Sequence, residues 1–214
     1  MAARHSAAED ERLTRSRHRL STRSAGGTQA VAAALAGWVE AGDVVVLTGD
    51  LGAGKTTFTQ GLVRALGVSE PVTSPTFTIA SHYHGVRLGS DQTQALVVNH
   101  LDVYRLGSLD EAEALGLDEM LDGDALTLIE WGEMIEPLLP CTRLIVKLEL
   151  VPFDEPPVAP SADVQHVPDE VSANRRVVEV ATEGHGAARR ERLADALIEA
   201  VGHIDVERDR DDRC

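Results

Sequence analysis

The sequence predicts an α/β fold: a mainly parallel β-sheet with helices on both faces and an antiparallel pair of strands near the C-terminus. Short apolar runs typical of buried strands alternate with amphipathic segments long enough to form helices. The last two runs, RLIVKLEL (143–150) and RRVVEVAT (175–182), are separated by a segment without helical periodicity and supply the antiparallel pair. The 214 residues suffice for one domain with its own core.

The first predicted element is a helix that opens at Thr28, a residue whose hydroxyl can cap a helix N-terminus. Val31, Leu35 and Trp38 recur at the spacing of one helical face. Gly42 follows the last of them and is expected to close the segment.

A buried strand over residues 44–47 comes next, because every residue there is apolar. A glycine-rich loop follows, and after it a helix over residues 55–66 that stops at Gly67. The β-rich run PTFTIASHY (75–83) and the apolar run ALVVNHL (95–101) predict further extended segments.

The second half of the chain continues the alternation. Ser108 and Glu111 form the capping-box pattern S-x-x-E in front of a helix that is predicted to end near Leu121. Residues 126–129 are apolar enough for another buried strand, and the periodicity of residues 187–201 predicts a last amphipathic helix.

Three segments fall outside this alternation. Residues 1–23 are rich in Ser, Arg and Ala, with six Arg against three acidic residues, and are predicted to be a disordered basic arm. The domain then occupies residues 24–202, with a proline-rich disordered insertion at about 151–172, and a charged tail occupies residues 203–214.

The charge of the chain restricts its partners. The formal net charge is −15 at pH 7, and such a field repels a phosphate backbone, so we do not expect the chain to bind nucleic acid alone. The apolar runs are much shorter than the ~20 residues of a membrane span, and two cysteines provide no disulfide framework. These features predict no membrane association and a cytoplasmic location.

The glycine-rich loop fits the P-loop pattern G-x-x-x-x-G-K-[ST], which predicts a P-loop NTPase-like fold. Its backbone N–H groups would surround a diphosphate, Lys55 would reach the β and γ phosphates, and the Thr56 hydroxyl would bind Mg²⁺. A turn with incidental glycines is the alternative, but the position between a buried strand and a helix favours the P-loop. The predicted nucleotide-binding residues are Gly49, Asp50, Leu51, Gly52, Ala53, Gly54, Lys55, Thr56 and Thr57.

A phosphate site also needs a carboxylate at the end of a neighbouring strand, to hold magnesium or to orient water. Asp102 after ALVVNHL and Glu130 after LTLI both meet this requirement. Spacing alone does not assign the metal to one and the water to the other.

Weaker signals surround these two acids. SPTF (74–77) occupies the position of a switch segment stiffened by Pro75, although the ordinary beginning of a strand explains it equally well. Strand alternation accounts for His100 and Tyr104 without a ligand role, and a tryptophan such as Trp131 is more often part of a core.

Five motifs taken together, GDLGAGKTT, SPTF, HLDVYRL, EALGLDEML and IEWGE, resemble the TsaE (YjeE) family of bacterial P-loop ATPases in tRNA threonylcarbamoyladenosine synthesis. The resemblance covers about residues 28–150 and is specific where LDVYR is followed by IEWGE. It implies ATP and Mg²⁺ as cofactors, TsaB and TsaD as partners, and contact with tRNA only through their complex. It also implies catalytic roles for Asp102, Lys55, Thr76 and Trp131, and Mg²⁺ ligands in Thr56 and Glu130.

Two other functions remain open from the residues alone. A P-loop kinase would transfer the phosphate to a small acceptor, and a nucleotide-gated interaction module would bind ATP with vestigial hydrolysis. A regulatory GTPase is disfavoured because no D-x-x-G motif occurs. The chain departs from a compact family member in the basic arm, the loop GVRLGSDQTQ (85–94) and the proline-rich insertion, which affect partner surfaces more than the ATP site.

Overall fold

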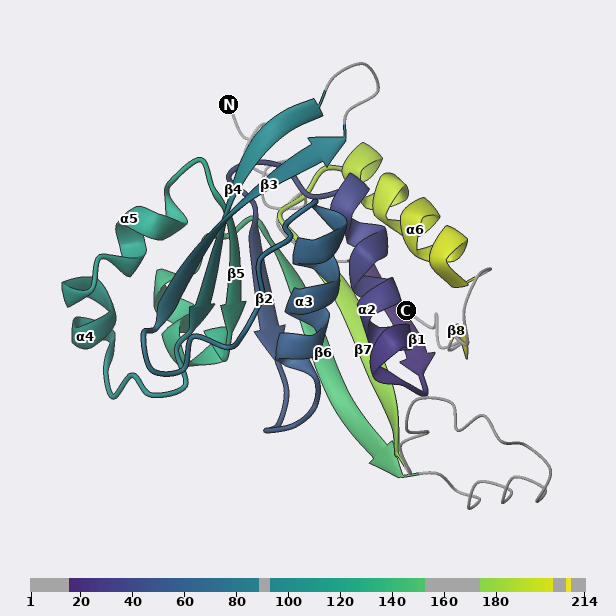
Figure 1. Cartoon of the computed structure of the whole chain (residues 1–214), viewed down its shortest axis with the longest axis horizontal. Helices are drawn as coiled ribbons and strands as arrows, with labels where there is room; N and C mark the ends of the chain where they lie inside the picture. Colours follow the sequence, from purple (N-terminus) through teal and green to yellow (C-terminus); the bar gives the residue numbers. More distant parts are fainter. Residues whose placement is uncertain (1–15, 89–92, 153–173, 202–206, 209–214) are drawn as a thin grey trace, which may run out of the picture.

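The structure, a computed structural model, describes residues 16–88, 93–152, 174–201 and 207–208 of the chain. Strands and helices follow one another through these residues (Figure 1), and the two short η elements are 3₁₀ helices. In chain order the elements are β1 (Ser16–Thr22), α2 (Ala25–Ala34), η1 (Leu35–Gly37), β2 (Val44–Thr48), α3 (Lys55–Ala65), β3 (Ala80–Leu88), β4 (Thr93–Asp102), α4 (Leu109–Ala114), α5 (Leu117–Leu121), β5 (Leu126–Glu130), η2 (Gly132–Leu138), β6 (Arg143–Pro152), β7 (Asn174–Glu183), α6 (Ala187–Val201) and β8 (Glu207–Arg208).

The strands of the described residues form one sheet in the order β3-β4-β5-β2-β6-β7-β1-β8. The central pairs β4–β5, β5–β2 and β2–β6 are parallel, and the pairs on both sides of this centre are antiparallel. β6 and β7 are the antiparallel pair that the sequence predicts near the C-terminus. The predicted α/β fold is thereby confirmed.

Strand β2 shows why the centre of the sheet is apolar at every position. Val45 and Leu47 pack into the core beneath α2, α3 and α6, whereas Val44 and Val46 pack into the core beneath α4, α5 and η2. Successive strand residues point to opposite faces, so a strand with helices on both faces needs apolar residues throughout. Figure 1 shows α2, α3 and α6 grouped apart from α4 and α5.

Strands β2, β4 and β5 end side by side at one edge of the sheet. Asp102, at the end of β4, lies opposite Glu130 at the end of β5, and Glu130 in turn lies opposite Leu47 on β2. The glycine-rich loop begins directly after β2. The carboxyl edge of a parallel sheet, where α/β proteins bind their ligands, therefore carries the loop and both carboxylates.

The cap of the first helix differs from the prediction. Ser24, not Thr28, caps α2, because the Ser24 hydroxyl oxygen accepts a hydrogen bond from the Gly27 N–H at 3.0 Å. Thr28 lies inside the helix, fully buried, with its hydroxyl 2.9 Å from that of Thr22. The α-helix ends at Ala34 and continues as η1.

The helix predicted to end near Leu121 is divided into α4 and α5. Gly116 adopts a φ of 70° between them, a left-handed conformation that ends one helix and that glycine adopts without steric cost. The predicted cap is present: the Ser108 hydroxyl accepts a hydrogen bond from the Glu111 N–H at 3.2 Å.

The expected boundary of the basic arm was wrong, because residues 16–22 form β1. This strand pairs with β7 along its whole length, and Leu20 is buried in the core. The charged residues conceal this strand in the sequence: the Arg17 side chain is 62% exposed, and its guanidinium pairs with Glu179 at 3.1 Å. Residues 1–15 lie outside the described part of the chain.

Three further predicted segment boundaries differ from those in the structure. The expected loop over residues 85–94 is mostly the β3–β4 hairpin, of which residues 89–92 lie outside the described part. The expected insertion begins later, because β6 extends to Pro152, and residues 153–173 lie outside the described part. Within the expected tail, β8 pairs with β1. Among the described residues, no helix is long and apolar enough to cross a bilayer.

Candidate nucleotide-binding site

The glycine-rich loop between β2 and α3 has a backbone that other residues do not readily adopt. Gly49, Gly52 and Gly54 have φ values of 129°, 80° and 109°. A Cβ atom on Gly49 would lie 2.1 Å from the Leu148 carbonyl oxygen, so no side chain fits there. The loop leads directly into the N-terminus of α3, where free N–H groups and the helix dipole favour an anion.

A cavity of about 490 Å³ opens beside this loop and gathers most of the predicted site. It is enclosed by the loop, the start of α3, the segment before β3 and the ends of β4 and β5. Gly49, Asp50 and Ala53 lie in the loop outside the cavity wall. The lining residues are Leu51, Gly52, Gly54, Lys55, Thr56, Thr57, Ser74, Thr76, Asp102, Tyr104, Arg105, Glu130 and Trp131.

Lys55 is held at this cavity by its own loop. Its side chain is buried, with the residue 5% exposed, and Nζ donates hydrogen bonds to the carbonyl oxygens of Gly49 at 2.6 Å and Asp50 at 3.0 Å. The ammonium also lies 3.5 Å from the centroid of the Trp131 ring. Burial lowers the pKa of Lys55, and the negative charge of Glu130 partly offsets this effect.

Thr56 and Glu130 are in direct contact. The Thr56 hydroxyl donates to Oε2 of Glu130 at 3.0 Å, and the other carboxylate oxygen, Oε1, lies 2.9 Å from Nε2 of His100. Hydroxyl and carboxylate oxygens are the ligands that Mg²⁺ prefers, and this ion usually keeps several waters, so few protein ligands suffice. Among the described residues, no group of three or more His, Cys, Asp or Glu side chains is arranged to hold a metal ion.

Asp102 joins two elements at the other side of the cavity. Its Oδ2 accepts hydrogen bonds from the hydroxyls of Ser74 and Thr76, both at 2.6 Å, and these two hydroxyl oxygens are also 2.6 Å apart. Its Oδ1 accepts a hydrogen bond from the Tyr104 N–H at 3.1 Å. The segment SPTF is therefore bound to the end of β4 through one carboxylate.

Sequence reasoning missed Ser74 and explained His100 and Tyr104 only by strand alternation. Tyr104 packs on Trp131 with ring centroids 4.8 Å apart, so it supports the ring that faces Lys55. Its position beside the stiff Pro75 was the one feature of the sequence that could have pointed to Ser74. The partner of its hydroxyl, Asp102, is 28 residues away along the chain.

Two residues beside the cavity have a strained backbone. Ile79 and Trp131, neither of them glycine, have φ values of 66° and 65°. The Ile79 carbonyl accepts a hydrogen bond from the Asp102 N–H, and the Trp131 N–H donates to the Leu47 carbonyl. Such conformations cluster at functional sites, where the surrounding contacts hold them in place.

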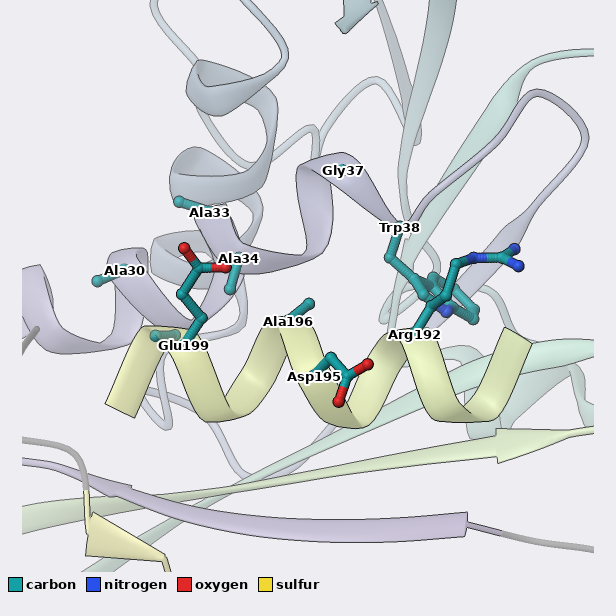
Figure 2. Close-up of a pocket in the computed structure, with 10 residues that line it drawn as sticks. Ala30, Ala33, Ala34, Gly37, Trp38, Arg192, Asp195, Ala196 and Glu199 are labelled. Carbon is teal, nitrogen blue, oxygen red and sulfur yellow. The ribbon is translucent and has the colours of Figure 1, made fainter. Parts of the chain in front are cut away.

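A larger cavity of about 600 Å³ lies between α2 and α6 and has a different character (Figure 2). Small side chains and Trp38 form most of its wall, with the charged groups of Arg192, Asp195 and Glu199 on the side of α6. None of the predicted site residues lines it. The smaller cavity beside the loop is therefore the candidate functional site.

A sequence model described as "Threonylcarbamoyl adenosine biosynthesis protein TsaE" matches residues 22–153, more than half of the chain. The chain belongs to the TsaE family. The predicted resemblance is thus confirmed, and with it membership of a family involved in tRNA threonylcarbamoyladenosine biosynthesis.

Individual TsaE proteins support this assignment. The tRNA threonylcarbamoyladenosine biosynthesis protein TsaE of Bacillus subtilis is 45% identical over 129 residues, which cover 60% of this chain and 75% of the relative. The protein of the same name from Treponema pallidum is 42% identical over 113 residues, which cover 53% of this chain and 77% of the relative. The protein from Mycobacterium tuberculosis is 43% identical over 125 residues, which cover 56% of this chain and 71% of the relative.

A solved structure extends the likeness from sequence to fold. The crystal structure of YdiB from Bacillus subtilis matches with a TM-score of 0.58 and 30% sequence identity, covering 87% of this chain and 97% of YdiB. The structural match therefore covers a larger share of this chain than residues 22–153, which the TsaE sequence model matches. With the loop, sheet and helix order described above, it confirms the predicted P-loop NTPase-like fold.

Proposed function

We propose that this TsaE-family chain binds ATP with Mg²⁺ and hydrolyses it as a subunit of the machinery that adds threonylcarbamoyl to adenosine next to the anticodon of tRNA. The observation that carries the proposal is the gathering of the P-loop, Thr56 and two strand-end carboxylates around one cavity. The reaction takes place in the cytoplasm, with TsaB and TsaD homologues as partners.

The loop and Lys55 bind the triphosphate. The N–H groups at the start of α3 face the phosphates, and the ammonium of Lys55 neutralises the charge on the β and γ groups. Thr56 and Glu130, whose oxygens are 3.0 Å apart, hold Mg²⁺. At this position Mg²⁺ would supply stabilisation of the negative charge on the phosphate oxygens.

Asp102 orients the attacking water. Its carboxylate lines the cavity and is fixed by the hydroxyls of Ser74 and Thr76 and by the Tyr104 N–H. A carboxylate held from three directions has one acceptor position left for a water, and would orient that water for attack on a γ phosphate.

A protein partner completes the site. Leu51, which lines the cavity, is 81% exposed, and Phe77, whose ring contacts the cavity-lining Arg105, is 84% exposed, although both are large apolar side chains. Tyr104 is exposed as well and lines the same cavity. Large exposed apolar side chains at a ligand site favour a protein partner that covers them. The net charge of −15 favours tRNA contact through the partners and not through this chain.

Two substitutions of the carboxylates test the proposal. Glu130→Gln should make ATP affinity much less dependent on magnesium, because an amide is a poor ligand for this cation. Asp102→Asn should keep magnesium-dependent binding and lose turnover, since only an interaction of the transition state is removed. Equal magnesium dependence in both variants would contradict the proposed division of roles.

The same proteins distinguish the alternatives. Wild-type hydrolysis measured as phosphate release should be slow and should rise when TsaB and TsaD are added together. Phosphate found on a small acceptor would indicate a kinase. Full tRNA modification by the Asp102→Asn protein would indicate an interaction module that needs ATP binding alone.

A further inference from the structure

His100 is a buried polar residue in the candidate site that the proposed function does not use. It lies within β4 and is 0% exposed. Its Nε2 atom is 2.9 Å from Oε1 of Glu130, while the Glu130 Oε2 atom accepts the hydroxyl of Thr56 at 3.0 Å. The two oxygens of Glu130 therefore have different partners, one inside the sheet and one at the P-loop helix.

The strand register places these groups together. His100 lies opposite Leu128 on β5, and Asp102 lies opposite Glu130. His100 and Glu130 are thus diagonal neighbours on the same face of the sheet, which is the face covered by α3, because Leu128 packs into that core. The Glu130 side chain reaches back along the sheet to the imidazole and not toward open solvent.

Core packing does not account for a histidine at this position. Nδ1 of His100 is buried and has no hydrogen-bond partner, and Val98 and Leu128 beside it are apolar core residues. A leucine or valine would avoid the cost of an unpaired polar atom. The imidazole is retained for the one contact that it makes, with Oε1 of Glu130.

We propose that His100 is a positioning residue for Glu130. An ionised carboxylate only accepts hydrogen bonds, so the proton of the imidazole is on Nε2, and this N–H donates a hydrogen bond to Oε1. This bond prevents rotation of the carboxylate and keeps Oε2 beside Thr56, where Mg²⁺ binds. The inference rests on the proposed function, in which Glu130 and Thr56 hold the ion; outer-shell partners of metal ligands commonly act in this way.

The experiment measures the magnesium dependence of nucleotide binding without turnover. A fluorescent N-methylanthraniloyl derivative of non-hydrolysable ATP is bound to the full chain, and Mg²⁺ is titrated. His100→Leu fills the space without a donor and should raise the Mg²⁺ concentration at half-saturation about tenfold or more. His100→Gln places an amide N–H near the position of Nε2 and should stay within about threefold of the wild type.

His82→Gln is the matched control, because His82 lies on the neighbouring strand β3 and is paired with Asn99 instead of Glu130. It should leave the magnesium dependence unchanged. If His100→Leu does not fold, His100→Asn replaces it, since its shorter amide cannot reach Oε1 and should lose magnesium affinity relative to His100→Gln. Wild-type magnesium dependence in the variant without a donor would overturn the inference.

Glu130→Gln, titrated in parallel, separates this inference from the function on which it rests. Loss of magnesium dependence in Glu130→Gln with no change in His100→Leu refutes the positioning role alone. Retained magnesium dependence in Glu130→Gln refutes the metal role of Glu130 and the inference with it. Loss in both variants, with recovery in His100→Gln, supports both.

Discussion

The ammonium of Lys55 lies 3.5 Å from the centroid of the Trp131 ring, and so connects the start of α3 to the residue that follows β5. Its other partners are the carbonyl oxygens of Gly49 and Asp50, so the charge is held by dipoles and by a π face inside the site. Trp131 in turn packs on Tyr104. The lysine and the aromatic pair therefore form one unit beside the glycine-rich loop.

Substitutions of Lys55 test the phosphate contact. Lys55→Ala should weaken ATP binding at least about tenfold and abolish hydrolysis, because a hydrogen bond to a charged group contributes about 1.5–3 kcal/mol. Lys55→Arg should also fail, since a planar guanidinium does not fit between two carbonyl oxygens and the Trp131 ring. Calorimetric ATP titration and phosphate release measure both effects. Wild-type turnover in the arginine variant would contradict the geometry described for this loop.

Trp131 should report nucleotide binding by its fluorescence. The chain has two tryptophans, and only Trp131 lines the nucleotide cavity, whereas Trp38 lines the cavity between α2 and α6. ATP should change the emission of the wild type and of Trp38→Phe, because phosphate would compete for the ammonium that faces the Trp131 ring. The signal should disappear in Trp131→Phe. A response that is lost in Trp38→Phe would place the nucleotide elsewhere.

Ser74 and Thr76 should affect turnover in a coupled way, because both hydroxyls donate to Oδ2 of Asp102. Each single alanine variant should lower kcat with little change in KM. The double variant should lose less than the sum of the two effects, with a coupling of about 0.5–3 kcal/mol. Thr78→Ala, on the same turn but exposed, is the control. Additive losses would show that the two hydroxyls act separately.

The parts of the site that could be predicted from sequence are those with a local pattern. The apolar run of β2, the glycines of the loop and a carboxylate after each of two strands are all visible within a few neighbouring residues. Parallel strands end at a common edge, so the fold class places Asp102 and Glu130 at the same edge, and the observed pairing of β4 with β5 makes them neighbours.

The remaining contacts depend on distances that a linear pattern does not contain. Ser74 reaches Asp102 only because the turn ending at Ile79, with its positive φ, brings SPTF back to β4. The sequence did not predict strand β1, for a related reason. Its partner β7 lies far along the chain, and Leu20 is preceded by Arg and His residues, which composition assigns to a disordered arm.

The structural role of β1 gives a prediction about stability. Leu20→Ala should lower the free energy of unfolding by about 2–5 kcal/mol, as large-to-small changes do in a packed core. Leu115→Ala is the control, because Leu115 is 45% exposed, outside the core, and its loss should cost much less. Urea denaturation measures both. Equal stability of the Leu20→Ala protein and the wild type would mean that residues 16–22 contribute nothing to the core.

A final prediction concerns pH and His185, which precedes α6 and packs on Trp38 with ring centroids 5.1 Å apart. The residue is 5% exposed, and burial, reinforced by the charge of Arg189, lowers its pKa below the ordinary value of 6.5. Above that value the imidazole is neutral in both the folded and the unfolded chain. As the pH falls through 6.5, the unfolded chain gains a proton that the folded chain does not, so stability is lost until the lowered pKa is reached.

The temperature at the midpoint of thermal unfolding should therefore decrease when the pH is lowered from about 7.5 to about 5.5, and the decrease should be smaller in His185→Gln than in the wild type. His84→Gln, at an exposed position on β3, should follow the wild type. The same fall in His185→Gln as in the wild type would mean that other groups cause the pH dependence.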